Sequence, residues 1–245
     1  MAPLQEVIFE IRWTFGTDSQ SMQAVDTEYP MAVGKMQNLV EDEFPVYKRK
    51  HPIDIPEQPV LHYQTVHQFW SKDGSWPILQ LGPGIFTIND TEKNYDWNTT
   101  FLPMVIKNVE KLWKAYSSKI KVNLASLRYI DVVSLPEYGQ KDQNWEDFIQ
   151  NNLNFSFKNS FNTRGKLSQF QMNQFFELED KSALHINISS GKKNREPGLI
   201  WQTAVVKNQA FTEEDLIEWL RKAHSVTSEL FKEMVKPHFY GSFTK

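Results

Sequence analysis

Hydrophobic and polar residues follow two different periods along the chain. In residues 6–14, Val7, Phe9, Ile11 and Trp13 occupy every second position, which is the spacing of side chains on one face of a β-strand. Apolar residues instead recur every three or four positions in residues 30–44, 99–116, 145–153 and 212–235, a pattern that predicts amphipathic helices. Further short runs predict strands, at residues 60–71, 76–82, 85–89, 122–135, 166–178, 182–189 and 199–207.

Glycine, proline and capping residues predict where these elements end. Gly82-Pro83-Gly84 indicates a tight turn, because glycine tolerates positive φ and proline restricts φ. We expect hairpin turns at residues 72–75, 179–181 and 191–198, and polar or extended connections at 16–29 and 46–59. Thr99 or Thr100 is expected to cap the second helix, and Thr212 with Asp215 resembles a capping box at the last one.

The same order of elements occurs twice. Each half reads as strand, helix, three strands and helix, and Leu124 follows Glu6 by 118 residues while Glu213 follows Trp97 by 116. We therefore predict an internal duplication, with an N-terminal repeat in residues 1–120 and a C-terminal repeat in residues 121–245. The fold class expected is α+β, with a largely antiparallel sheet and helices packed on one face.

Composition restricts the chemistry that the chain offers. The 245 residues carry a net charge of −3 and 40% hydrophobic residues, as in an ordinary globular protein. The absence of cysteine excludes disulfides, thiolate metal sites and cysteine nucleophiles. No run of about 18 apolar residues is present and the first residues do not resemble a signal peptide, so we expect a cytoplasmic protein that does not enter the membrane.

Three segments together resemble a known group of proteins. These are residues 3–13 (PLQEVIFEIRW), residues 82–89 (GPGIFTIN, followed by Tyr95 and Trp97) and residues 128–131 (RYID). In this order they resemble a sporadically distributed family of bacterial and archaeal proteins of about this length, to which no activity is assigned. The resemblance spans the chain. Its patchy distribution implies mobile or defence-associated genes, so an antiviral defence role is the first context to test.

One arginine interrupts the first strand of each half. Arg12 and Arg128 lie among apolar residues, where a charge needs either a partner or a ligand. One interpretation is a pair of anion-binding arginines on the sheet surface. The other is structural ion pairing, of Arg12 with Glu6 or Glu10 and of Arg128 with Asp131.

Two short basic segments are further candidates for contact with nucleic acid. One is Lys48-Arg49-Lys50-His51, and the other comprises Lys192, Lys193 and Arg195 in a predicted hairpin loop. Basic loops with aromatic neighbours bind the phosphate backbone in some proteins, although most such loops are simply solvated.

No enzymatic motif is evident. The chain contains no phosphate-binding loop, dinucleotide fingerprint or nucleophile elbow, and its six histidines lack metal-ligand spacing, so we expect neither a metal nor a cofactor. A hydrolase would need convergence of residues distant in sequence, such as Arg128, Asp131 and His185.

Two functional hypotheses of a non-enzymatic kind remain. The first is a binding or adaptor protein that presents a sheet face or an oligomer interface to a macromolecular partner, with a homodimer as the expected assembly. The second is recognition of a nucleotide or nucleic acid through Arg12, Arg128 and the basic segments.

Overall fold

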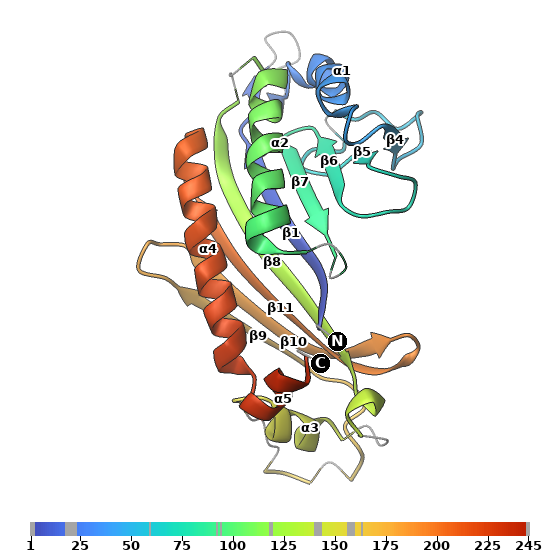
Figure 1. Ribbon diagram of the computed structural model, residues 1–245, viewed down its shortest axis with the longest axis vertical. Helices are drawn as coiled ribbons and strands as arrows, with labels where there is room; N and C mark the ends of the chain where they lie inside the picture. The colour runs from blue at the N-terminus through green and yellow to red at the C-terminus, as the bar shows by residue number, and fades with distance from the viewer. Residues whose placement is uncertain are drawn as a thin grey trace. The chain divides into compact units, whose positions relative to one another are not determined.

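The computed structural model describes residues 3–17, 24–58, 60–91, 93, 95–117, 120–139, 144–155, 160–162 and 164–243. Within them the chain forms an α+β fold with a nine-stranded sheet, which confirms the predicted class (Figure 1). The strands are β1 (Leu4–Trp13), β4 (Val46–Arg49), β5 (His67–Trp70), β6 (Ile78–Gly82), β7 (Ile85–Asp90), β8 (Val122–Ser134), β9 (Gln171–Glu177), β10 (Ala183–Lys193) and β11 (Glu196–Asn208). A separate small hairpin is formed by β2 (Gly16–Thr17) and β3 (Ala24–Val25).

Five α-helices accompany the sheet in the described ranges. They are α1 (Tyr29–Val40), α2 (Leu102–Ala115), α3 (Trp145–Asn152), α4 (Glu213–Met234) and α5 (Pro237–Ser242). The π-turn η1 (Trp97–Phe101) leads directly into α2, and the short 3₁₀ turn η2 (Pro136–Tyr138) follows β8. No helix in the described part of the chain combines the length and apolar composition that a membrane span needs.

The strand order of the sheet is β4-β5-β6-β7-β1-β8-β11-β10-β9. The strands are antiparallel; for example, Phe9 of β1 lies opposite Ile88 of β7, and His185 of β10 lies opposite Phe175 of β9. The order is similar on the two sides of the β1–β8 pair. On each side the strand that begins the predicted repeat is followed outward by three later strands in reverse chain order: β1-β7-β6-β5 and β8-β11-β10-β9. A duplication predicts this order, but no sequence comparison tests the duplication, and it stays a prediction.

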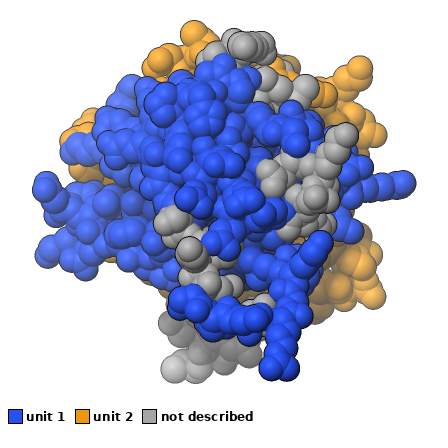
Figure 2. Space-filling view, turned by 90° about the horizontal axis from the view of Figure 1, so that it is seen from below, with its two compact units in different colours: residues 1–6, 128–205, 221–245 blue, residues 7–127, 206–220 orange. Residues whose placement is uncertain are grey.

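Two compact units are distinguished in Figure 2. Unit 1 contains residues 1–6, 128–205 and 221–245, and unit 2 contains residues 7–127 and 206–220. The chain enters each unit more than once, because β1, β8, β11 and α4 each contribute residues to both. The two repeats predicted at residues 1–120 and 121–245 follow the order of elements along the chain, and their bounds differ from those of the two units.

The core of unit 2 follows from the alternation in β1. Val7, Phe9, Ile11 and Trp13 are at most 2% exposed. Trp13 packs edge-on against Tyr116 just after α2, with ring centroids 5.1 Å apart. Because successive strand residues point to opposite faces, Glu10 and Arg12 lie on the other face, away from this helix-covered core.

The core of unit 1 is built in the same way from β8, β10 and β11. Leu184, Ile186 and Ile188 are buried along β10. The Trp201 ring of β11 stacks on Phe231 of α4, with centroids 5.9 Å apart. Helix α4 therefore covers one face of these strands. The face opposite the helices is called the open face below.

Most predicted turns and caps are present. Gly84 has φ +74°, and the carbonyl of Gly84 accepts a hydrogen bond from the Trp13 amide at 3.1 Å. Thr212 Oγ1 accepts from the Asp215 amide at 3.1 Å, which confirms the cap of α4. The second helix is capped differently from the prediction: Asp96 Oδ1 accepts a hydrogen bond from the Thr99 amide at 2.8 Å at the start of η1, and α2 itself has no side-chain cap.

Three predicted boundaries were wrong. Residues 46–49 form the edge strand β4 instead of a connection, because the prolines begin only at Pro52. Residues 60–66 contain no strand in their described part, since this segment turns back over the β6–β7 hairpin. β10 extends to Lys193 and β11 begins at Glu196. The loop expected at 191–198 is therefore only a two-residue turn at Asn194-Arg195, where both φ angles are positive.

Candidate binding surface on the open face

Arg128 lies in a hollow on the open face of unit 1. The hollow has a volume of about 330 Å³, within the range of small-molecule sites. Its lining comes only from strands, which here present polar and aromatic side chains. These residues, named together the Arg128 hollow, are Arg128, Gln171, Asn173, Phe175, His185, Ile186, Asn187, Gln202 and Ala204.

Strand register explains why these side chains converge. On β10 the buried residues alternate with His185 and Asn187, which therefore point to the open face. Their direct partners on β9 are Phe175 and Asn173. The Asn187 amide donates to Asn173 Oδ1 at 2.6 Å, and the Phe175 and His185 rings meet edge to face at 4.7 Å.

The guanidinium of Arg128 has no acidic neighbour among the described residues that line this hollow. The side chain is exposed, and among the described residues no carboxylate lines the hollow or forms an ion pair with Arg128. The predicted ion pair with Asp131 is wrong, because residues three apart on a strand point to opposite faces. Asp131 is 5% exposed and outside the hollow, so Arg128 and His185 converge there without it.

Arg12 lines a separate hollow on the open face of unit 2. This hollow has a volume of about 380 Å³. Arg12 Nε donates to Glu10 Oε1 at 2.8 Å, so the predicted ion pair with Glu10 is present. The Arg12 guanidinium also lies 5.6 Å from the Tyr63 ring centre, a cation–π contact. The hollow's lining comprises Ile8, Glu10, Arg12, Lys50, His51, Tyr63, Gln64, Thr65, Gln80, Ile85, Thr87 and Asn89.

A chain of polar side chains forms the floor of the Arg12 hollow. Gln80 Nε2 donates to Thr87 Oγ1 and Asn89 Oδ1, both at 3.1 Å, and its Oε1 accepts from Gln68 at 2.9 Å. Thr87 in turn donates to Asn89 at 2.8 Å. These amides already satisfy one another, so a ligand would compete with existing hydrogen bonds here.

The basic segment at residues 48–51 is divided between the two faces of the sheet. Lys48 pairs with Asp73, and Arg49 Nη2 lies 3.0 Å from Glu57 Oε1 on the helix side. Lys50 donates to Thr65 Oγ1 at 2.8 Å and lines the Arg12 hollow with His51. The four residues therefore do not form one patch.

The second basic segment lies at the β10–β11 hairpin. Lys192 and Lys193 belong to β10, and Arg195 lies in the turn. Lys193 Nζ is 3.8 Å from Glu137 Oε2, a weak ion pair. None of these three residues lines either hollow.

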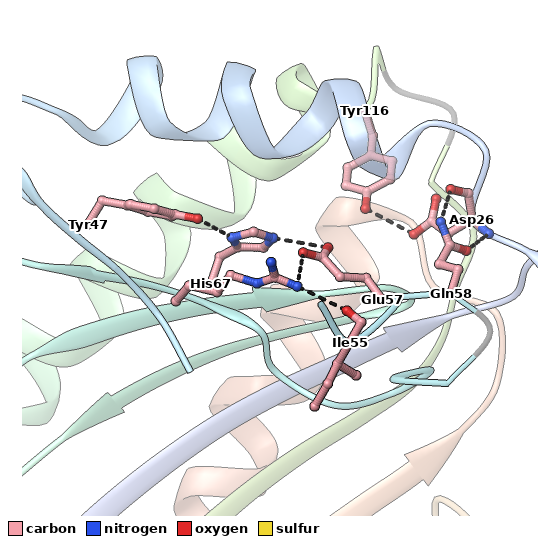
Figure 3. A network of polar contacts seen from close by, with 8 residues as sticks. Asp26, Tyr47, Ile55, Glu57, Gln58, His67 and Tyr116 are labelled. Carbon is pink, nitrogen blue, oxygen red and sulfur yellow. Dashed lines mark hydrogen bonds and ion pairs between the residues drawn. The ribbon is translucent and has the colours of Figure 1, made fainter. Parts of the chain in front are cut away.

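A hydrogen-bonded chain on the helix side of unit 2 joins Arg49 to Tyr47, Glu57 and His67, which no sequence motif marks (Figure 3). Tyr47 Oη lies 2.7 Å from His67 Nδ1, and His67 Nε2 lies 3.2 Å from Glu57 Oε2. Glu57 is also bound by Arg49, which donates to the Ile55 carbonyl at 3.3 Å. Burial lowers the pKa of His67 although Glu57 opposes the shift, and the ring bridges Tyr47 and Glu57.

Asp26 is the centre of a second network, of which Figure 3 shows the hydrogen bonds to Tyr116 and Gln58. Its Oδ2 accepts hydrogen bonds from Trp13 Nε1 at 2.8 Å, Tyr116 Oη at 3.0 Å and the Gly84 amide at 3.1 Å. Burial raises the pKa of Asp26 against these three bonds. The two networks tie the connections at residues 24–28 and 50–58 to the sheet and to α2, which is a structural role.

The pattern of β5 contained a usable signal for His67. Phe69 is buried on the helix side, and His67 is two residues away on the same face, so a buried histidine was predictable there. Glu57 and Asp26 lie in irregular segments, and no local pattern marks them. In the described ranges, no three metal-binding side chains gather closely enough to hold an ion.

Comparison of the chain with protein-family models, with curated proteins and with solved structures finds no match. The family resemblance of residues 3–13, 82–89 and 128–131 therefore stays a prediction. Inference about function rests on the two hollows.

Proposed function

We propose that the chain is a non-enzymatic binding protein whose open sheet face binds phosphate-bearing ligands, that is, nucleotides or nucleic acids. Arg128 is the residue that carries the proposal. Among the described residues no carboxylate pairs with this exposed guanidinium, so its donors are available to a ligand, and its planar fork matches two phosphate oxygens.

The surroundings of Arg128 favour an anion. The Arg128 hollow combines one cation with four amide side chains and no described acid, so its local charge is positive although the chain carries −3. The Arg12 hollow adds a weaker case. There Glu10 offsets part of the arginine's charge. Lys50 contributes a second positive charge, and His51 contributes an imidazole ring.

The test compares Arg128→Ala with Arg221→Ala, which removes an exposed arginine from α4 in the same unit. Binding of a fluorescein-labelled oligonucleotide is followed by fluorescence anisotropy at about 50 mM salt and upward. Loss of a charge-assisted bond weakens binding about 10- to 150-fold for Arg128→Ala. Arg221→Ala should bind like the parent protein.

Two results would contradict the proposal. One is an Arg128→Ala protein that binds as tightly as the parent protein. The other is a parent protein that binds neither oligonucleotides nor mononucleotides at low salt.

Self-association through β9 is a second candidate function, favoured by a different observation. β9 lies at one edge of the sheet, and its Phe176 is 46% exposed on the face opposite the Arg128 hollow. An edge strand with an exposed ring is suited to pairing with a second copy of the same strand. Light scattering on the eluting protein measures this, and a monomer at all concentrations would reject the homodimer.

A further inference from the structure

Phe175 is an unusual residue in the Arg128 hollow. Its side chain is 70% exposed, although it contacts the His185 ring at 4.7 Å. A single exposed phenylalanine on a protein surface is ordinary and needs no explanation. This ring, however, lies in the same hollow as an arginine without a carboxylate partner, so an aromatic surface and a cation are offered together.

The amides of the hollow add a third kind of contact. Asn173 and Asn187 bind each other, whereas Gln171 and Gln202 form no recorded side-chain bond with any described residue. Their planar groups each offer donors and an acceptor. Nucleobase edges present the complementary groups, and unstacked bases are read in this way.

The depth of the hollow distinguishes a single nucleotide from a polymer. Arg128 and the β9 residues of the lining are exposed, and only Ile186 and Ala204 are buried, so the hollow is shallow. Sites for small molecules usually enclose most of their ligand. A strand of nucleic acid instead gains affinity by adding contacts from each nucleotide along an open surface.

We propose that the Arg128 hollow binds single-stranded nucleic acid, with one base stacked on Phe175 and a neighbouring phosphate bound by Arg128. Gln171 and Gln202 contact base edges. This inference rests on the proposed function and makes it specific: stacking requires unpaired bases, so duplexes and base-free polyphosphates lack the contact to Phe175.

Two exposed phenylalanines of unit 1 provide a pair of variants. Phe175→Ala removes the ring from the hollow, and Phe161→Ala removes an exposed ring that does not line the hollow. Anisotropy is measured with a labelled oligothymidine, with the same length of duplex, and with inorganic tripolyphosphate as a competitor. Circular dichroism and thermal unfolding confirm that each variant is folded.

Phe175→Ala should weaken oligothymidine binding about 5- to 150-fold, the factor that corresponds to about 1–3 kcal/mol for one stacked base. Phe175→Trp should restore the binding, and Phe161→Ala should leave it unchanged. Competition by tripolyphosphate should survive Phe175→Ala and be lost in Arg128→Ala. The duplex should bind more weakly than the single strand.

The failures of the two proposals are distinguishable. If Phe175→Ala binds oligothymidine like the parent protein while Arg128→Ala does not, the stacking inference is overturned and the anion site stands. Equal binding of duplex and single strand would also overturn it. If the parent protein binds neither oligothymidine nor tripolyphosphate, both proposals fall.

Discussion

Replacement of Asp131 by asparagine is expected to stabilise the protein at neutral pH. Asp131 lies in β8, is 5% exposed, and has no recorded hydrogen-bond donor or ion-pair partner among the described residues. Burial alone raises its pKa from the usual 3.8 to about 8. Asparagine has nearly the same shape and carries no charge, so the change removes the cost of ionisation.

The magnitude follows from the difference between the folded and unfolded states. Above pH 3.8 the unfolded chain releases the Asp131 proton, whereas the folded chain retains it until about pH 8. Rising pH therefore stabilises the unfolded state relative to the folded state, and the stability of the fold falls by about 1.4 kcal/mol per pH unit in this window. At pH 7 the accumulated loss is about 4 kcal/mol, an upper estimate because buried sites relax.

The assay is urea denaturation followed by tryptophan fluorescence at pH values between about 4 and 8. Asp131→Asn and the parent protein should unfold at similar urea concentrations at the acid end. The variant should then become progressively more stable by comparison as pH rises. A stability difference that is the same at pH 5 and pH 7 would refute the assignment of a neutral, buried carboxyl to Asp131.

Three further substitutions test the packing of unit 2. Asp26→Ala leaves the three groups that donate to its carboxylate without an acceptor, so denaturation should show a loss of about 3–5 kcal/mol, in contrast to Asp131. Gly82→Ala places a Cβ 1.8 Å from the Gln64 carbonyl oxygen, which is backbone and cannot easily move, so thermal unfolding should show a loss of about 3 kcal/mol. Gly34→Ala in α1 meets no atom within 4 Å and should instead stabilise by about 0.5–1 kcal/mol; stability unchanged by both glycine replacements would contradict the close approach at Gly82.

Local patterns predicted most elements because each pattern has a local cause. The period of two along β1 reflects the one buried face of that strand, and the spacing of three and four residues along α2 reflects the one buried face of that helix. Tight turns were predictable where glycine is required, as at Gly84 with φ +74°. The edge strand β4 was missed because its four residues offer too short a pattern to distinguish a strand from an extended connection.

Arg12 and Arg128 show what can and cannot be predicted from the sequence alone. The alternation in β1 places Arg12 on the face away from Phe9 and Ile11, whereas β8 shows no regular alternation around Arg128. The sequence leaves open whether a partner neutralises either arginine. Strand register decides that question: Glu10 is two residues from Arg12 on the same face, while Asp131 is three residues from Arg128 and points the other way.

The sequence by itself determined the fold class and most helices and strands, since these depend on residues close together in the chain. Only the tertiary structure decided which distant residues come together at Arg128 and at His67. Phe175 and His185 reach the Arg128 hollow through the β9–β10 register and the sheet order, and Glu57 reaches His67 through an irregular connection. Such contacts depend on pairing between segments far apart in the chain, which no local pattern encodes.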